Sequence, residues 1–411
     1  MPTARSHRWI IAAAATLMQV ALGAVYAWSV FRKPLAASLG ASVAEVNLTF
    51  TTTILMLGFA AFIGGLWITK VGPRVIGITS GALYGLGVYL AGFAEHSLPL
   101  LYVTYGAIAG FGIGLGYIVP LATLVKWFPD KRGMITGIAV AGFGAGALAF
   151  GPLARVLIRA YGPFNTFHVF GAIFFLVIVN ASSWMRDPPA GYRPAGFRPR
   201  PSTTSVNKVD HELGAALRTW QWYALWVVLF LNVSAGISII AEAAPMAQEI
   251  GGATEVQATA LVGTIAIFNG AGRFAWAALS DLIGRRAVFT VLFLAQAVVF
   301  LLLPFATSYE AFLALACVSL LCYGGAFGTM PAFVADYFGP RTVGKVYGLM
   351  LTAWGAGAIL GPVLVSRIHD GTGHYTGGLR AIAVIMLFGS IVPMLLRTPR
   401  PLMSRSAART R

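Results

Sequence analysis

The chain has 411 residues, of which 58% are hydrophobic and only 10% are charged, and its mean hydropathy is +0.78. A typical soluble domain has about 25% charged and 45–50% apolar residues, so this composition excludes an ordinary soluble enzyme. The formal net charge is +16, but the basic residues stand in short gaps between long apolar segments, and this placement argues against a nucleic-acid-binding surface.

Twelve apolar segments are each long enough to cross a bilayer, which takes about 20 residues. The first six lie near residues 9–30, 48–68, 75–93, 101–125, 133–157 and 167–185. The second six lie near residues 222–246, 258–279, 287–303, 311–333, 344–367 and 379–396. We therefore predict an all-α membrane protein with twelve transmembrane helices in two bundles of six.

A polar segment at residues 186–221 separates the two groups of spans. It opens with Arg-Asp-Pro-Pro and is rich in proline, arginine and serine, a composition that cannot form a core of its own. We predict an N-terminal six-helix bundle at residues 1–185, a cytoplasmic linker at 186–221, and a C-terminal six-helix bundle with a short cytoplasmic tail at 222–411.

Most of the 29 lysines and arginines fall in connections on one side of the predicted membrane. Cytoplasmic connections normally carry this excess, so we place both termini and the linker in the cytoplasm. The short loops and arginine-rich ends favour a prokaryotic inner membrane. As partners we expect the lipid bilayer and a small organic monoanion, with or without a proton, but no nucleic acid, and we expect a monomer.

The two predicted bundles resemble one another. Residues 65–74, after the second span, resemble residues 277–286, after the eighth span, at an offset of 212. A Trp-Phe pair at 127–128 and a Tyr-Phe pair at 337–338 open two stretches that both end in Gly-Pro, at an offset of 210. Because six spans is an even number, both bundles start on the same side, which predicts a parallel repeat of the kind found in some transporters.

Arg273 is the one basic residue deep inside a span, about 12 Å of helix before Asp281 at the cytoplasmic end. A charge at such depth costs at least about 2.5–3.5 kcal/mol, so we expect it to face the bundle interior and bind a substrate anion. The alternatives are snorkelling or pairing with a buried acid. Asn269 lies four residues earlier on the same helix face. It can donate to a carboxylate or hold the guanidinium, or it can serve only helix packing.

Aromatic residues recur at repeat-related positions in the fourth, fifth, tenth and eleventh spans. Tyr117 matches Phe327 at an offset of 210, and Phe143 matches Trp354 at an offset of 211. Tyr323 precedes Phe327 by four residues and shares its helix face. We expect these side chains to line a pocket, with simple core packing as the alternative.

Features of enzymes are missing from the sequence. Cys317 and Cys322 fall inside one apolar segment, where we expect packing and neither a disulfide nor a metal site. His369 and His374 stand in an outer connection, and no histidine pair has metal-ligand spacing. No nucleophile and base occur at one depth, so we expect neither enzymatic activity nor a cofactor or metal.

The parallel repeat and the short basic connection after the second span of each bundle resemble the major facilitator superfamily over the whole chain. In the first bundle the connection departs from the family pattern, because Thr69 stands where the family usually has an aspartate. A further group lies at the cytoplasmic ends of the spans, where we expect a gate or a structural role. This group is Lys131, Arg132, Asp281, Arg285 and Asp336.

Four segments resemble the monocarboxylate transporters and the related oxalate–formate antiporters. They are Gly-Ala-Val-Tyr-Ala-Trp at 23–28, Trp-Phe-Pro-Asp-Lys-Arg-Gly at 127–133, Arg-Thr-Trp-Gln-Trp at 218–222 and Asn-Gly-Ala-Gly-Arg at 269–273. In that family the arginine that matches Arg273 binds the substrate carboxylate. The positions that surround it there match Tyr26, Tyr117, Phe143, Tyr323, Phe327, Leu351 and Trp354.

Two departures from this resemblance bear on the substrate. Oxalate–formate antiporters carry a lysine where this chain has Trp354, and a dianion in a dry site needs two compensating charges, so a monoanion is favoured. Animal monocarboxylate transporters have an aspartate where this chain has Asn269, and Val30 falls near the position of their first-span lysine. These differences leave proton coupling by the family mechanism open.

The resemblance implies a secondary transporter of small monocarboxylates, such as lactate, pyruvate or formate, that works by alternating access. Either anion exchange or proton symport fits. An exchanger of oxalate, other dicarboxylates or sugar acids is the same-fold alternative, and a carboxylate sensor that does not transport is the alternative from another class.

Overall fold

The structure, a computed structural model, describes residues 4–189, 191–194 and 211–399. The elements before the linker are α1 (Ala4–Leu22), η1 (Gly23–Ala27), α2 (Trp28–Leu39), α3 (Val43–Ala91), α4 (Leu98–Leu101), η2 (Tyr102–Ala109), α5 (Gly110–Trp127) and α6 (Arg132–Ser183). Those after it are α7 (Leu213–Ala216), α8 (Trp220–Gly251), α9 (Glu255–Ile283), α10 (Arg285–Leu302), η3 (Leu303–Phe305), α11 (Tyr309–Phe338), α12 (Val343–Met350), α13 (Thr352–Thr372), α14 (Thr376–Gly389) and α15 (Ile391–Leu395). The predicted all-α class is confirmed for these residues.

Two helices each contain two of the predicted spans. Nine helical stretches of the described chain are long and apolar enough to cross a membrane. Helix α3 breaks at Gly72, where φ is 82°, and α6 breaks at Gly162, where φ is 80°. A proline follows each glycine and suits the first turn of the next helix, because its fixed φ is helical and its missing N–H is not needed there. With these breaks and the less apolar α9, the described residues contain the twelve predicted spans.

Backbone irregularities interrupt several of the spans. The first span passes through η1, a 3₁₀ segment, and the fourth begins with the π-helical segment η2. The eleventh span is divided into α12 and α13 at Leu351. Tight or wide turns of this kind inside long helices often mark functional sites, and Tyr26 of the predicted pocket lies in η1.

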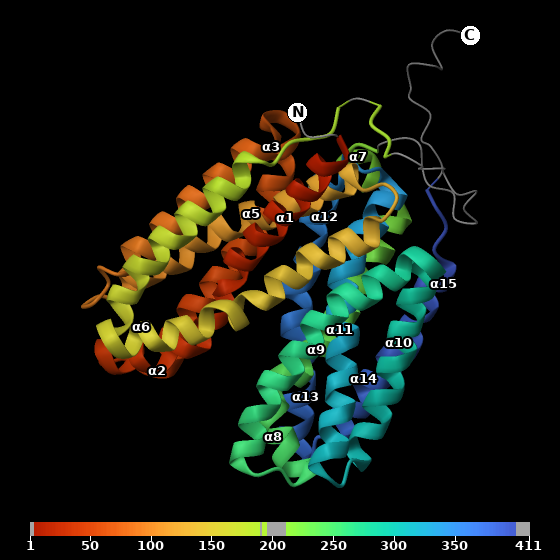
Figure 1. Cartoon of the computed structure of the whole chain (residues 1–411). Coiled ribbons are helices and arrows are strands. Elements are labelled where there is room, and N and C mark those ends of the chain that lie inside the picture. Colours follow the sequence, from red (N-terminus) through yellow and green to blue (C-terminus); the bar gives the residue numbers. More distant parts are fainter. Residues whose placement is uncertain (1–3, 190, 195–210, 400–411) are drawn as a thin grey trace.

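The helices before and after the linker form two groups that meet at one end and diverge toward the other (Figure 1). We call the end at which α7 and the chain after α6 lie the linker end, and the opposite end the distal end. Between the groups, α6 packs on α9 and α11, and α12 packs on α3. Gly65 meets Gly344 and Gly133 meets Ala277 so closely that a Cβ on either first-group glycine would overlap backbone atoms. Small residues at such crossings let membrane helices approach closely.

Large apolar side chains cover the outside of the helices. Leu55 and Ile359 are both 68% exposed, and Phe388 is 66% exposed. Polar solvent would make this surface unstable, whereas lipid tails match it. The outward face of the fold is therefore that of a multi-pass membrane protein.

Candidate functional site

Arg273 lies inside the molecule and has only neutral partners among the described residues. Its side chain is 3% exposed, and α9 continues for ten residues beyond it toward the linker end. The guanidinium donates from Nη1 to the Val140 carbonyl oxygen over 3.1 Å and from Nε to Asn269 Oδ1 over 3.5 Å. The predicted interior position is thus observed, and neither alternative, snorkelling nor an ion pair with a described acid, occurs.

Glycines on both sides make room for the turn of α9 that carries this arginine. Gly137 of α6 and Gly328 of α11 both approach the Arg273 backbone, and Gly324 approaches Asn269. A Cβ at Gly144 would lie 3.6 Å from Arg273 Nε. These positions allow α6, α9 and α11 to pass one another at backbone distance.

Aromatic rings from the second group pack on the same guanidinium. The Arg273 guanidinium carbon lies 5.7 Å from the centre of the Phe327 ring, within cation–π range. Phe327 contacts Trp354 edge to face at 5.3 Å and Tyr323 at 5.3 Å between ring centres. Leu351 is 1% exposed, at the break between α12 and α13.

The first group supplies the repeat-related rings in nearly the same arrangement. Tyr117 contacts Phe143 edge to face at 5.1 Å with an interplanar angle of 81°, and the matching Phe327–Trp354 pair has 72°. Tyr26 contacts Phe143 from the other side at 5.3 Å. The hydroxyls of Tyr26, Tyr117 and Tyr323 all interact electrostatically with Arg273. The structure therefore brings predicted tyrosines of both groups together around one charge.

Sequence reasoning missed Tyr347. Its side chain is fully buried, its hydroxyl faces that of Tyr117, and it interacts with Arg273. The residue lies four positions before Leu351 and seven before Trp354, which is one helix face. This spacing was the signal that could have found it.

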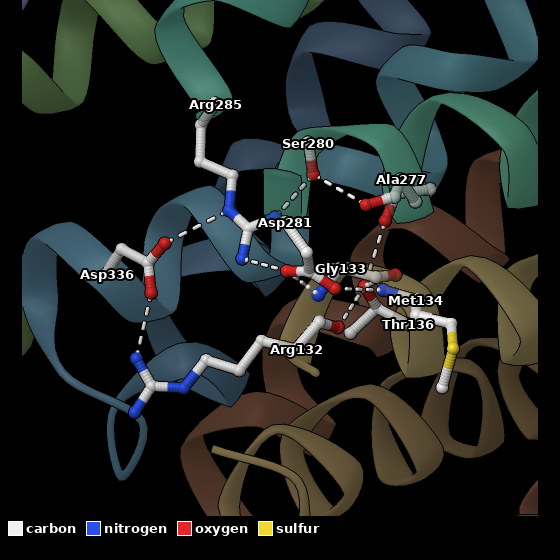
Figure 2. Close-up of polar contacts among 10 residues, drawn as sticks. Arg132, Gly133, Met134, Thr136, Ala277, Ser280, Asp281, Arg285 and Asp336 are labelled. Atoms are coloured by element: carbon white, nitrogen blue, oxygen red, sulfur yellow. Dashed lines mark hydrogen bonds and ion pairs between the residues drawn. The ribbon is translucent and has the colours of Figure 1, made fainter. Parts of the chain in front are cut away.

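A polar network joins the two groups at the linker end (Figure 2). Asp281 at the end of α9 accepts hydrogen bonds from the backbone N–H groups of Gly133 over 2.9 Å and Met134 over 2.8 Å. These are unpaired donors of the first turn of α6, where a carboxylate is favoured by both capping and the helix dipole. Asp281 also pairs with Arg285, with 2.6 Å between Oδ1 and Nη2.

Asp336 continues this network. Its Oδ2 lies 3.0 Å from Arg285 Nε, and its Oδ1 lies 2.8 Å from Arg132 Nη1 in the other group. Lys131 is exposed beside Arg132 and makes no ion pair with a described residue. Four of the five predicted residues of the linker end thus share one network, and the fifth stands outside it.

The repeat-related connection in the first group has no such network. Thr69 occupies the position equivalent to Asp281, and its hydroxyl donates to the Leu66 carbonyl of its own helix over 3.2 Å. The first turn of α12 instead meets α3 through the close approach of Gly344 to Gly65. Among the described residues, the acidic side chains that join the two groups at this end, Asp281 and Asp336, therefore both belong to the second group.

Comparisons with known proteins agree with this architecture. The family model of the Major Facilitator Superfamily matches residues 9–246 and 225–411. The chain is 31% identical over 399 residues to the oxalate:formate antiporter of Oxalobacter formigenes, covering 96% of this chain and 93% of that one. It is 31% identical to the uncharacterized MFS-type transporter YhjX of Escherichia coli, over 86% of each chain. It is 28% identical to monocarboxylate transporter 13 of Bos taurus, over 93% of this chain and 87% of that one.

Among solved structures, the fold matches that of FucP in its outward conformation with a TM-score of 0.73. The match covers 93% of this chain and 97% of that one at 16% identity. A match at this identity concerns the fold, whereas the family match covers nearly the whole sequence. The chain belongs to the Major Facilitator Superfamily and is a multi-pass secondary transporter rather than an enzyme.

Proposed function

We propose that the protein transports small monocarboxylates, and one observation carries this proposal. Arg273 is 3% exposed and holds its charge among neutral oxygens and aromatic rings, with no ion pair to a described residue. A buried charge without a counter-charge is costly. A substrate carboxylate supplies that counter-charge and can take both of its hydrogen bonds from the guanidinium fork.

The charge of the site favours a substrate with a single carboxylate. Of the side chains that line it, only Arg273 is cationic, and Trp354 fills the position where oxalate–formate antiporters carry a lysine. One guanidinium neutralises one carboxylate, whereas a second would remain buried and unpaired. The tyrosine hydroxyls around the arginine suit a neighbouring hydroxyl or keto oxygen, as in lactate or pyruvate.

The proposed mechanism is alternating access, in which residues 1–185 rock against residues 222–396 around Arg273. The linker end is placed in the cytoplasm of an inner-membrane protein because most basic residues gather there. In the conformation described above, the network of Asp281, Arg285 and Asp336 holds this end closed. Transport requires the network to break and the groups to separate there, while the distal ends approach.

The test is uptake by the purified protein in proteoliposomes. Arg273→Lys and Arg273→Gln should lower kcat/KM for labelled lactate or pyruvate at least tenfold, since charged hydrogen bonds contribute about 1.5–3 kcal/mol and lysine cannot make the bidentate contact. Arg380→Gln, at an exposed arginine of α14, is the matched control and should transport normally. Near-normal uptake by both Arg273 variants would remove this assignment.

A second candidate, exchange of oxalate or other dicarboxylates, is favoured by the 31% identity to an oxalate:formate antiporter. Competition separates the two. Under our proposal, unlabelled pyruvate and lactate block labelled uptake, whereas oxalate and malonate block it poorly. The reverse order would establish the dicarboxylate exchanger. A carboxylate sensor would bind the anion in the same preparation without any flux.

A further inference from the structure

A cluster of titratable side chains joins three elements at the distal end of the second group. Glu249, in the last turn of α8, lies 2.9 Å from His369 Nε2 near the end of α13, and 3.9 Å from His374 Nδ1 in the next connection. The Tyr375 backbone N–H donates to Glu249 Oε1 over 3.4 Å. The Tyr375 ring also stacks on His369, with 4.1 Å between ring centres. One carboxylate thus fastens α8 to the connection between α13 and α14.

The tyrosine extends this cluster toward the membrane. Its hydroxyl donates to Glu242 Oε2 over 3.0 Å, and Glu242 lies about two helical turns closer to the middle of α8 than Glu249. Burial, together with the Glu242, Glu249 and Asp370 carboxylates, raises the pKa of Tyr375. The hydroxyl therefore remains a donor through the physiological range, and the histidines are the groups whose charge can change.

The charges around His369 determine how its protonation would change the contact between α8 and α13. Facing it are Glu249 from α8, Asp370 on α13 with 3.9 Å between Oδ1 and Nδ1, and His374 from the connection. Tyr375 links it further to Glu242. With neutral histidines this group holds three carboxylates and no positive charge. A proton on His369 converts its contact with Glu249 into an ion pair. The His369 side chain is 29% exposed, so it exchanges protons with the medium.

The fastened helix also touches the substrate site. Gly236 of α8 lies directly against the Tyr323 ring, and Tyr323 interacts with Arg273. Glu242 follows Gly236 by six residues, or about 9 Å of the same helix. A change in how the distal part of α8 is held therefore acts on the same helix that contacts Tyr323 of the site.

We propose that Glu249 and His369 form a proton-binding site whose occupation fastens α8 to the α13–α14 connection. The bound proton favours the conformation described above, in which the linker end is closed and the fastening is complete. Histidine gains its proton between about pH 5 and 8. The fastening is therefore strongest at acidic pH and is lost as the pH rises through that range. This inference rests on the proposed transport only for its second test.

The first test needs no substrate. Amide hydrogen exchange over residues 366–378 is measured at about pH 6 and 8 and corrected for the intrinsic pH dependence of exchange. In the wild type, protection at acidic pH should exceed that at basic pH by about two- to fivefold, the range of a partly exposed ion pair. His369→Gln and Glu249→Gln should abolish this difference. His96→Gln, at an exposed histidine of the first group's distal connection, should keep it. The same pH response in His369→Gln would overturn the proposal.

The second test measures KM for a monocarboxylate supplied on the distal side. The pH on that side is varied, and the pH on the linker-end side is kept constant. Because apparent affinity scales with the fraction of molecules in the binding-competent conformation, acidification should lower the wild-type KM by a similar factor. In His369→Gln, KM should not change with pH, and kcat should equal that of the wild type. If the wild type transports no monocarboxylate, the proposed function is refuted. The result of the amide hydrogen-exchange test would still stand. A pH-dependent KM that persists in His369→Gln would refute the proton site alone.

Discussion

Removing the carboxylate of Asp281 should release the linker end. This side chain accepts from the N–H groups of Gly133 and Met134 in the first turn of α6 and pairs with Arg285 of its own group. In Asp281→Ala the two N–H groups lose their acceptor. The Arg285 guanidinium keeps Asp336, so α9 and α10 should stay folded while the contact between the two groups weakens.

The magnitude follows from these contacts. Loss of a capping acceptor costs about 0.5–2 kcal/mol, and loss of a hydrogen bond to a charged group costs about 1.5–3 kcal/mol. The two figures describe overlapping contacts, so we expect about 2–3 kcal/mol against the closed linker end. That corresponds to about a 30- to 150-fold shift in the equilibrium between closed and open linker ends.

Distance measurement between two spin labels in nanodiscs reports this shift. Lys70→Cys and Leu282→Cys place one exposed label in each group at the linker end, in a background where the buried Cys317 and Cys322 are alanine. The unmodified network should give mainly the short distance. Asp281→Ala should move a large part of the population to a longer distance and raise the accessibility of the linker end.

Asp187→Asn is the control. Asp187 pairs with Lys126 over 2.7 Å within the first group and the adjoining chain, and its side chain is 46% exposed. Its removal should leave the distance distribution unchanged, because exposed pairs contribute about 0–1 kcal/mol and this one does not join the groups. Identical distributions for the Asp281 and Asp187 variants would refute the reasoning.

Three further predictions concern the site. Gly144→Ala should raise KM several-fold, because the new Cβ would lie 3.6 Å from Arg273 Nε. This is an ordinary contact distance, so Tm should not fall. In the control Gly270→Ala, the new Cβ would have no neighbour within 4 Å, and both uptake kinetics and Tm should stay unchanged. Tyr347→Phe should lower Tm only slightly, since it removes one buried hydroxyl that faces Tyr117, and should weaken substrate binding by about 1 kcal/mol, read by titration. Trp354→Lys should lower monocarboxylate uptake and increase inhibition by oxalate, because it adds a second positive charge; unchanged selectivity would argue against charge matching.

The sequence predicted the parts of this fold that depend on local composition. Apolar length predicted the spans, and the depth of Arg273 in its helix predicted an interior charge, because lipid excludes unpaired charges. The offset between Tyr117 and Phe327 predicted equivalent places for their rings, and the two edge-to-face pairs now have similar geometry. These features follow from one helix at a time or from comparing the two halves.

Other features depend on how the helices approach one another, and the spacing of residues along the sequence does not predict this. The acceptor of Arg273 is a backbone carbonyl, that of Val140, brought near by glycines of α6. His369 was expected in an outer connection, yet it lies in the last turn of α13 and meets Glu249, 120 positions earlier in the chain. Tyr347 was overlooked because each aromatic residue alone resembles core packing. Such contacts require the relative placement of helices that only the structure supplies.

The hydrogen bond from Arg273 to Val140 suggests how occupancy and movement are linked. The arginine belongs to the second group, and the carbonyl belongs to α6 of the first, so this hydrogen bond is one of the contacts between the groups. Separation at the linker end must break this bond, and without substrate it would leave a buried guanidinium donor unpaired, at a cost of about 1–3 kcal/mol or more. A bound carboxylate accepts the same protons and moves with the arginine, which removes that cost. Under the proposed function, we therefore expect the loaded carrier to have the lower barrier to rocking, so that exchange is faster than return without substrate.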